Sequence, residues 1–325
     1  MNLFKKLISH VKGETDTPLP VANEARTSNQ IELFGRPFYI DDLDSLGLRA
    51  NAVFEPEETR LCQALVSTGD TCLDIGANIG YYTVLFSHLI GPPGQVVAIE
   101  PDPENFSLLK QNCAPELGTS NISQHQVALG DTPGTAKLFK GKDNHGMHRL
   151  YKSVCCSAEA TQVPVVVGDS LELGPIDFLK IDIEGYEYPA LLGLKETIGT
   201  SPRIKILAEF SPLSMLEAGL PVRPLVEMLV ELNLVPLELS SEGWCALDSQ
   251  ALLEATDIAD KIDIIDITTN MADESNVRIA EKAASVLLES GYTRPLLENL
   301  VWIPTGMLDE VIATLATSAA ATATE

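Results

Sequence analysis

The chain has 325 residues, of which 45% are hydrophobic, and its 46 acidic against 22 basic residues give a net charge of −24. This length can bury a large core and allows one or two domains. The negative charge disfavours a nucleic acid as partner, because a polyanion is repelled at long range and no dense basic cluster offsets this. The six cysteines lack the spacing of a zinc site and indicate reduced thiols in a cytoplasmic protein.

The first 69 residues predict a short helix, a linker and a small cap segment. Residues 1–8 are basic and briefly apolar, without the long apolar region or cleavage site of a signal peptide. Residues 12–30 are rich in Thr, Pro, Asn and Ser, so we expect residues 1–30 to form an N-terminal helix followed by a linker. Residues 31–69 then predict a cap that starts with a strand and contains a helix over about 57–67. No stretch of the chain reaches the length of a transmembrane segment.

Residues 70–269 predict one domain in which strands alternate with helices. This alternation is typical of a mostly parallel sheet with helices on its faces. We expect strands at 71–75, 95–100, 122–127, 163–167, 177–182, 204–209, 234–239 and 262–268. We expect helices near 79–90, 103–113, 186–197 and 222–233.

Two segments depart from this alternation. Residues 141–153 carry glycine, two histidines and polar residues, and we expect this excursion near the carboxyl ends of the strands, where ligands bind in open α/β sheets. Residues 270–325 predict a helical C-terminal extension. Its last part, 316–325, is rich in Ala and Thr and is expected to be disordered.

The sequence DTCLDIGANIGY at residues 70–81 predicts a buried strand, a glycine-rich turn and the start of a helix. Gly76 and Gly80 let the backbone turn sharply and approach a ligand closely. The next strand ends in Glu100, and a carboxylate at this interval is the usual acceptor for ribose hydroxyls in Rossmann-like sites. Together these features predict a cofactor that contains a nucleoside.

The residues of the turn distinguish between cofactors. A dinucleotide site places glycine where this chain has Asn78, so that the pyrophosphate can approach the backbone. The carboxylate of Asp74 would repel a pyrophosphate, but it suits an ammonium or a sulfonium group. The pattern D-x-G-x-N-x-G resembles motif I of class I S-adenosylmethionine-dependent methyltransferases. NAD is disfavoured without being excluded.

Over about residues 50–270, further motifs follow one another in the order that is found in one protein family. They are FEPEE at 54–58, DIGANIGYYT at 74–83, EPDPEN at 100–105, VALGD at 127–131, KIDIEG at 180–185 and AEFSP at 208–212. This series resembles the FkbM family of methyltransferases. The resemblance implies a Rossmann-like class I methyltransferase fold with a mostly parallel seven-stranded sheet and S-adenosyl-L-methionine as cofactor. It also implies methylation of a hydroxyl group on a sugar, a glycolipid or a polyketide-like acceptor.

The cofactor site is assigned from the turn and from the ends of the next two strands. We expect Glu100 to accept hydrogen bonds from the ribose hydroxyls and the residues after the third strand to flank the adenine. Asp102 precedes Pro103 and fits a helix N-cap equally well. The candidate cofactor contacts are Asp74, Gly76, Asn78, Gly80, Glu100, Asp102, Ala128 and Leu129.

The candidate catalytic residues lie in two segments. Asp182 and Glu184 are two residues apart, so in extended chain both carboxylates point to the same side of the strand. They could remove a proton from a hydroxyl group, hold a divalent cation or orient a sugar. His145 and His148 lie in the excursion, and an imidazole near neutral pKa is a natural base for an alcohol. Two histidines are too few to predict a metal site, so a metal requirement stays open.

Two further acids are candidate contacts for a small-molecule or glycan acceptor. Glu55 lies in the cap just before the sheet begins, and Glu209 ends the strand at 204–209. Two alternatives to a methyltransferase stay open. One is a nucleotide-cofactor-binding oxidoreductase, which Asn78 disfavours, and the other is a non-catalytic protein that binds the cofactor.

Overall fold

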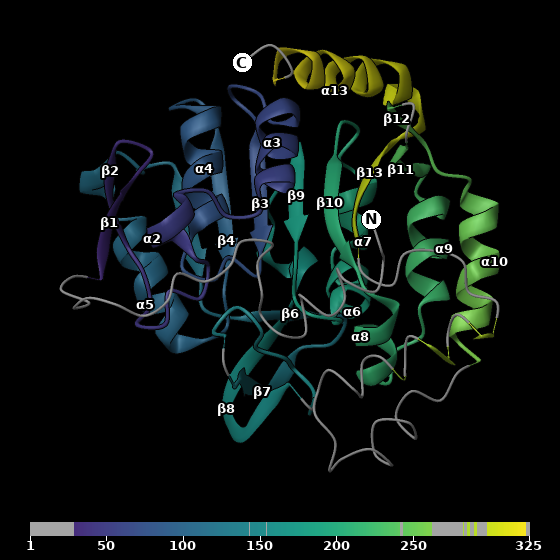
Figure 1. Cartoon of the computed structure of the whole chain (residues 1–325), viewed down its shortest axis with the longest axis horizontal. Coiled ribbons are helices and arrows are strands. Elements are labelled where there is room, and N and C mark those ends of the chain that lie inside the picture. The colour runs from purple at the N-terminus through teal and green to yellow at the C-terminus, as the bar shows by residue number, and fades with distance from the viewer. Residues whose placement is uncertain are drawn as a thin grey trace.

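The structure is a computed structural model. It describes residues 29–142, 144–153, 155–240, 243–261 and 298–322, together with residues 282, 285, 286, 289 and 290. Figure 1 shows a central sheet with helices on both faces and a smaller sheet that projects beyond one end of the central strands. The predicted α/β class is confirmed.

The central sheet contains eight strands in the order β12-β11-β13-β10-β9-β3-β4-β5. The five strands from β10 to β5 pair in parallel, whereas β13 pairs antiparallel with both β10 and β11. The strands are β3 (Thr71–Ile75), β4 (Gln95–Ile99), β5 (Ile122–His125), β9 (Phe178–Ile181), β10 (Lys205–Phe210), β11 (Leu234–Ser240), β12 (Gly243–Ala246) and β13 (Glu298–Pro304).

The strand count and the C-terminal segment differ from the prediction. The sheet has eight strands rather than seven, because β12 forms a hairpin with β11 at the edge. The prediction that residues 270–325 are a helical extension is wrong at β13, which lies inside the sheet between β10 and β11. The strand forms there because both faces of its apolar run are buried, with Trp302 facing one core and Val301 the other. The predicted strand at 262–268 lies outside the described residues.

Two hydrophobic cores cover the two faces of the sheet. Alternate strand residues enter different cores, as the period of two requires: Leu73 packs with α6 to α10, and Cys72 packs with the cap, α4 and α5. These helices are α4 (Tyr81–Ile90), α5 (Pro103–Asn112), α6 (Glu187–Leu192), α7 (Lys195–Gly199), α8 (Pro212–Glu217), α9 (Arg223–Glu231) and α10 (Ser249–Ala259). Short 3-10 turns occur at η1 (Pro115–Leu117), η2 (Gly168–Leu171) and η3 (Thr305–Met307).

The cap contains the strand and the helix that the sequence predicts. A hairpin of β1 (Gln30–Leu33) and β2 (Arg36–Tyr39) leads through α2 (Leu48–Asn51) to α3 (Pro56–Leu65). Its apolar side chains, such as the fully buried Phe38, belong to the same core as α4. The cap therefore packs directly against the first helix of the central domain.

The segment that interrupts the alternation forms a second sheet of three strands. β8 (Cys156–Val167) lies between β6 (Ala128–Gly130) and β7 (Gly134–Gly141), so the predicted strand at 163–167 belongs here and not to the central sheet. At the C-terminus α13 (Leu308–Thr322) lies across one end of the sheet (Figure 1). It contains most of the segment expected to be disordered, because residues such as Val311 and Leu315 are buried against the cap core.

Candidate active site

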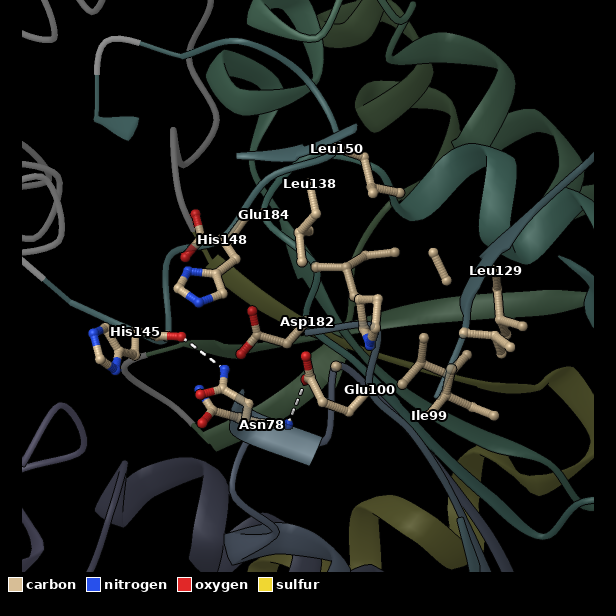
Figure 2. A pocket seen from close by; sticks show the side chains of 18 residues that line it. Asn78, Ile99, Glu100, Leu129, Leu138, His145, His148, Leu150, Asp182 and Glu184 are labelled. Carbon is tan, nitrogen blue, oxygen red and sulfur yellow. Dashed lines mark hydrogen bonds between the residues drawn. The ribbon is translucent and has the colours of Figure 1, made fainter. Parts of the chain in front are cut away.

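A pocket with about 580 Å³ of empty space lies at the carboxyl ends of β3, β4 and β9, beside β6. Figure 2 shows that one end of the pocket is polar, with Asn78, Glu100 and Asp182, while aliphatic side chains form the other end. The aliphatic side chains are Ile99, Leu129, Leu138 and Leu150.

The glycine-rich turn forms one wall of this pocket. Gly76 has φ +82°, and a Cβ atom at this position would lie 2.1 Å from the carbonyl oxygen of Asp182. The N–H groups of Gly76 and Ala77 both donate to the carbonyl of Ile99 at 3.0 Å. The turn is therefore pressed against the end of β9, and only glycine fits there. Gly80 does not line the pocket; its missing Cβ allows contact with Leu109 of α5.

Glu100 is buried and lines the pocket next to the turn. Its Oε2 accepts the N–H of Asn78 and its Oε1 accepts the N–H of Asp102, both at 2.8 Å. Burial raises the pKa of Glu100 to about 8, although these two bonds act in the opposite direction. Each carboxylate oxygen has a second acceptor position. The fixed carboxylate can therefore accept two hydroxyl groups from a vicinal diol.

Two predicted cofactor contacts have internal roles instead. Asp74 is buried and its Oδ2 accepts the hydroxyl of Thr83 at 2.6 Å, so it holds the first turn of α4. Successive residues of a strand face opposite sides, and the next residue, Ile75, lines the pocket. The side chain of Asp74 therefore points away from the pocket. Asp102 caps α5, where its Oδ1 accepts the N–H groups of Glu104 and Asn105. Neither aspartate lines the pocket.

The excursion after β7 returns over the pocket and forms its roof. The carbonyl of His145 accepts the amide of Asn105 at 3.0 Å, and its N–H donates to the hydroxyl of Ser45 at 3.0 Å. These bonds attach the roof to α5 and to the cap. The imidazole Nδ1 lies 3.8 Å from Oδ1 of Asp41. Figure 2 shows this ring directed away from Asp182, so the backbone of His145, rather than its imidazole, faces the pocket.

His148 lines the pocket, but both of its ring nitrogens face protein atoms. Nδ1 accepts the N–H of Gly141 at 3.1 Å, which places the proton of a neutral imidazole on Nε2. Nε2 lies 3.8 Å from Oδ2 of Asp102. Burial lowers the pKa of His148, which favours this neutral form. In this tautomer neither nitrogen offers a lone pair to a substrate, so the geometry argues against His148 as the general base.

Asp182 and Glu184 both line the pocket, but their surroundings differ. The side chain of Asp182 is 27% exposed, and its Oδ2 accepts a hydrogen bond from Nζ of Lys180 at 3.0 Å. Glu184 is buried, and its Oε2 accepts from Nη2 of Arg149 at 2.7 Å. The guanidinium also binds Glu217 at 2.9 Å. Asp182 is therefore the more accessible carboxylate, whereas Glu184 belongs to a buried ion pair.

The residues around these acids include two cations that the sequence analysis did not assign. Lys180 stands out in the sequence as a lysine inside an apolar strand, whereas Arg149 lies in a polar loop and carries no such signal. Glu55 and Glu209, the predicted acceptor contacts, do not line the pocket. Glu55 accepts the hydroxyl of Tyr82 at 2.8 Å, and burial raises its pKa to about 7. Burial also raises the pKa of Glu209.

Within the part of the chain that the structure describes, no three side chains of the metal-binding types form a group that could hold an ion. Among the same residues, no helix combines the length and the hydrophobicity needed to cross a bilayer.

The family model of the methyltransferase FkbM domain matches residues 74–233, which contain the turn, Glu100 and the pair of acids after β9. This stretch is an FkbM methyltransferase domain. The predicted family is confirmed, and the central sheet has the class I methyltransferase fold. The match favours a methyltransferase over the oxidoreductase alternative.

Two curated proteins show the extent of the similarity. Protein-L-isoaspartate O-methyltransferase of Methanococcus maripaludis (strain C5) is 30% identical over 155 residues, which cover 47% of this chain and 66% of the relative. Methyltransferase 1 of Beauveria bassiana is 27% identical over 147 residues, which cover 38% of this chain and 58% of the relative. The chain therefore spans about two thirds or less of the length of these relatives.

Solved structures of methyltransferases are also similar to the chain. Methyltransferase FkbM from Methylobacillus flagellatus KT has 20% identity and a TM-score of 0.35, and the match covers 52% of this chain and 44% of that chain. An O-methyltransferase from Bacillus cereus in complex with SAH has 15% identity and a TM-score of 0.36, and the match covers 63% and 84% of the two chains.

Proposed function

We propose that this protein transfers the methyl group of S-adenosylmethionine to a hydroxyl oxygen of a small-molecule or glycan acceptor, such as a sugar, a glycolipid or a polyketide-like compound. The observation that carries the proposal is the fixed carboxylate of Glu100 beside the turn at Gly76, in a pocket whose other end is aliphatic. A diol acceptor, a close backbone and an apolar slot are what an adenosine group requires.

The residues present fit this cofactor. Glu100 would accept the ribose hydroxyls, and Ala128 and Leu129 would flank the adenine. Gly76 lines the pocket next to Asn78 and Glu100, and the chain that carries the sulfonium would lie along this turn. When bound, S-adenosylmethionine supplies an electrophilic methyl group.

The protein must align an acceptor oxygen and remove its proton. We assign removal of this proton to Asp182, because its carboxylate reaches the pocket and Lys180 binds only one of its two oxygens. The buried pair of Glu184 and Arg149 keeps the floor of the pocket rigid next to it. The roof around His145 is held to α5 by the amide of Asn105, and alignment of the acceptor supplies much of the rate.

The acids near the site favour a neutral hydroxyl acceptor over an anionic one. Asp182 and Glu184 line the pocket, and Glu209 lies one residue before the end of the neighbouring strand β10. An acceptor carboxylate would be repelled by Asp182, the more exposed of these acids. Because Glu55 and Glu209 do not line the pocket, we assign no acceptor contact to them.

Calorimetric titration with S-adenosylmethionine, S-adenosylhomocysteine and NAD in parallel tests the cofactor. We expect micromolar binding of the first two and none of NAD. Transfer of a labelled methyl group to a panel of sugars, glycolipids and hydroxylated lipids then tests the acceptor class. Tight binding of NAD without a response to the sulfonium compounds would overturn the proposal.

A further inference from the structure

A buried lysine links Asp182 to the cap. Nζ of Lys180 lies 3.0 Å from Oδ2 of Asp182 and 4.5 Å from the centre of the Tyr82 ring in α4. The hydroxyl of Tyr82 donates to Oε2 of Glu55, the residue before α3, at 2.8 Å. Lys180 is only 4% exposed, so this ammonium is solvated mainly by protein groups.

The sheet explains why a lysine is stable in this apolar strand. In the register of β3 and β9, Lys180 lies opposite Asp74, and both side chains point toward α4. Burial favours the neutral amine, but the carboxylates of Asp182, Glu55 and Asp74 hold the pKa of Lys180 above its ordinary value. The lysine therefore stays a cation and cannot itself accept a proton from a substrate.

We propose that Lys180 is the positioning residue for Asp182, and this inference rests on the proposed function, in which Asp182 removes the acceptor's proton. Lys180 holds Oδ2, which leaves Oδ1 for the acceptor hydroxyl. The backbone of Asp182 is fixed as well, since its N–H donates to the carbonyl of Ile75 at 3.1 Å and its own carbonyl packs against Gly76. The base is thus oriented relative to the turn that holds the cofactor.

Tyr82 and Glu55 fix the lysine in turn. The ring of Tyr82 lies under the ammonium, which is a favourable cation–π arrangement. The backbone of Glu55 has φ +43°, a conformation that residues other than glycine seldom adopt. Such conformations are often found at functional sites. The start of the cap helix is therefore part of the device that orients Asp182.

The test compares Lys180→Met and Lys180→Arg with Lys205→Met. Lys205 is a matched control because it is 5% exposed and begins the neighbouring strand β10, at the opposite end of the sheet from the pocket. We expect Lys180→Met to lower kcat by about 100-fold, the loss that a misplaced catalytic group can cause, while the Kd of S-adenosylhomocysteine changes less than about threefold. Lys180→Arg should recover most of kcat, and Lys205→Met should retain it.

The proposal is overturned if Lys180→Met keeps the wild-type kcat, or if Lys205→Met lowers kcat equally. If Lys180→Met does not fold, Tyr82→Leu removes the ring beneath the ammonium, and an unchanged kcat there overturns the proposal. Crystal structures of the wild type and Lys180→Met with S-adenosylhomocysteine need no acceptor. An Asp182 carboxylate in the same place in both would overturn the proposal. Wild-type protein that binds S-adenosylhomocysteine and methylates no acceptor would count against the proposed function instead.

Discussion

The backbone N–H of Asn78 donates to Oε2 of Glu100 over 2.8 Å, which joins the glycine-rich turn after β3 to the acid after β4. Asn78 has φ +50°, so its N–H faces the neighbouring strand end instead of continuing the ladder of β3. The second oxygen of Glu100 holds the N–H of Asp102. The two motifs that predict a nucleoside cofactor are therefore a single hydrogen-bonded unit.

Glu100→Gln should disrupt this unit even without a ligand. A glutamine has only one oxygen, so its NH₂ group would face one of the two N–H donors, Asn78 or Asp102. We expect the free energy of unfolding to fall by about 1–3 kcal/mol and the affinity for S-adenosylhomocysteine to fall at least about tenfold. Denaturant titration and calorimetry measure the two effects. Glu104→Gln is the control, because the Glu104 side chain is 66% exposed and should change stability by less than about 1 kcal/mol.

The pKa of about 8 for Glu100 gives cofactor binding a pH dependence of known sign. The ribose hydroxyls donate, so the ionised carboxylate is the better acceptor. The affinity for S-adenosylhomocysteine should rise as pH increases from 6 to 8, by at most about tenfold per pH unit, and level off above. Titrations in buffers of different ionisation enthalpy should detect the released proton. An affinity that is flat across this range would remove Glu100 from the ribose site.

The stability of the ligand-free protein should change with pH in the opposite direction. Burial raises the pKa of Glu100 to about 8 and those of Glu55 and Glu187 to about 7. Between the ordinary pKa of a glutamate and these values, the unfolded chain has released protons that the folded chain keeps. Unfolding then releases protons, so the free energy of unfolding should fall as pH rises from about 4.5 to 8. Chemical denaturation across this range measures it, and a rise in stability would contradict the prediction.

The alternation of strands and helices was predictable because each central strand is a short apolar run followed by a turn. β13 was not, because its run from Asn299 to Pro304 follows a long stretch without strand signals and pairs with strands far away in sequence. Pairing of this kind is set by tertiary contacts rather than by local propensity. The tail was misjudged for a similar reason, since Leu315 is buried by the cap and not by its own neighbours.

The backbone part of the site was predictable and the side-chain part was not. A glycine such as Gly76 marks a conformation that other residues seldom adopt, so a sequence pattern reports it directly. The direction of a side chain depends on its partners. Asp74 lies one residue before the end of β3 and Asp182 directly follows β9, yet the first bonds Thr83 in the helix layer while the second lines the pocket. Nothing in a loop sequence indicates that Arg149 will pair with Glu184.

Arg149→Met tests that buried pairing. The substitution leaves the carboxylates of Glu184 and Glu217 without their cation, and removal of one partner from a buried ion pair costs about 3–5 kcal/mol. Thermal or denaturant unfolding should show a loss of that size. The double variant Arg149→Met/Glu184→Gln should recover part of it. Arg60→Met on the exposed side of α3 is the control, and an equal loss there would remove the special role of Arg149.

Gly76→Ala tests whether the turn is shaped for the cofactor or only for the chain. Two effects act at Gly76: its φ of +82° strains an alanine by about 1–2 kcal/mol, and its Cβ would overlap the carbonyl oxygen of Asp182. Gly118→Ala separates them, because Gly118 has φ +83° and no atom within 4 Å of its Cβ position. We expect Gly118→Ala to lose only the strain energy and to bind S-adenosylhomocysteine normally. Gly76→Ala should lose more stability and, in the molecules that stay folded, bind at least about tenfold more weakly, because the turn must move away from β9. Calorimetry measures the affinity of both folded variants for S-adenosylhomocysteine. Equal affinities would mean that the turn at Gly76 does not contact the cofactor.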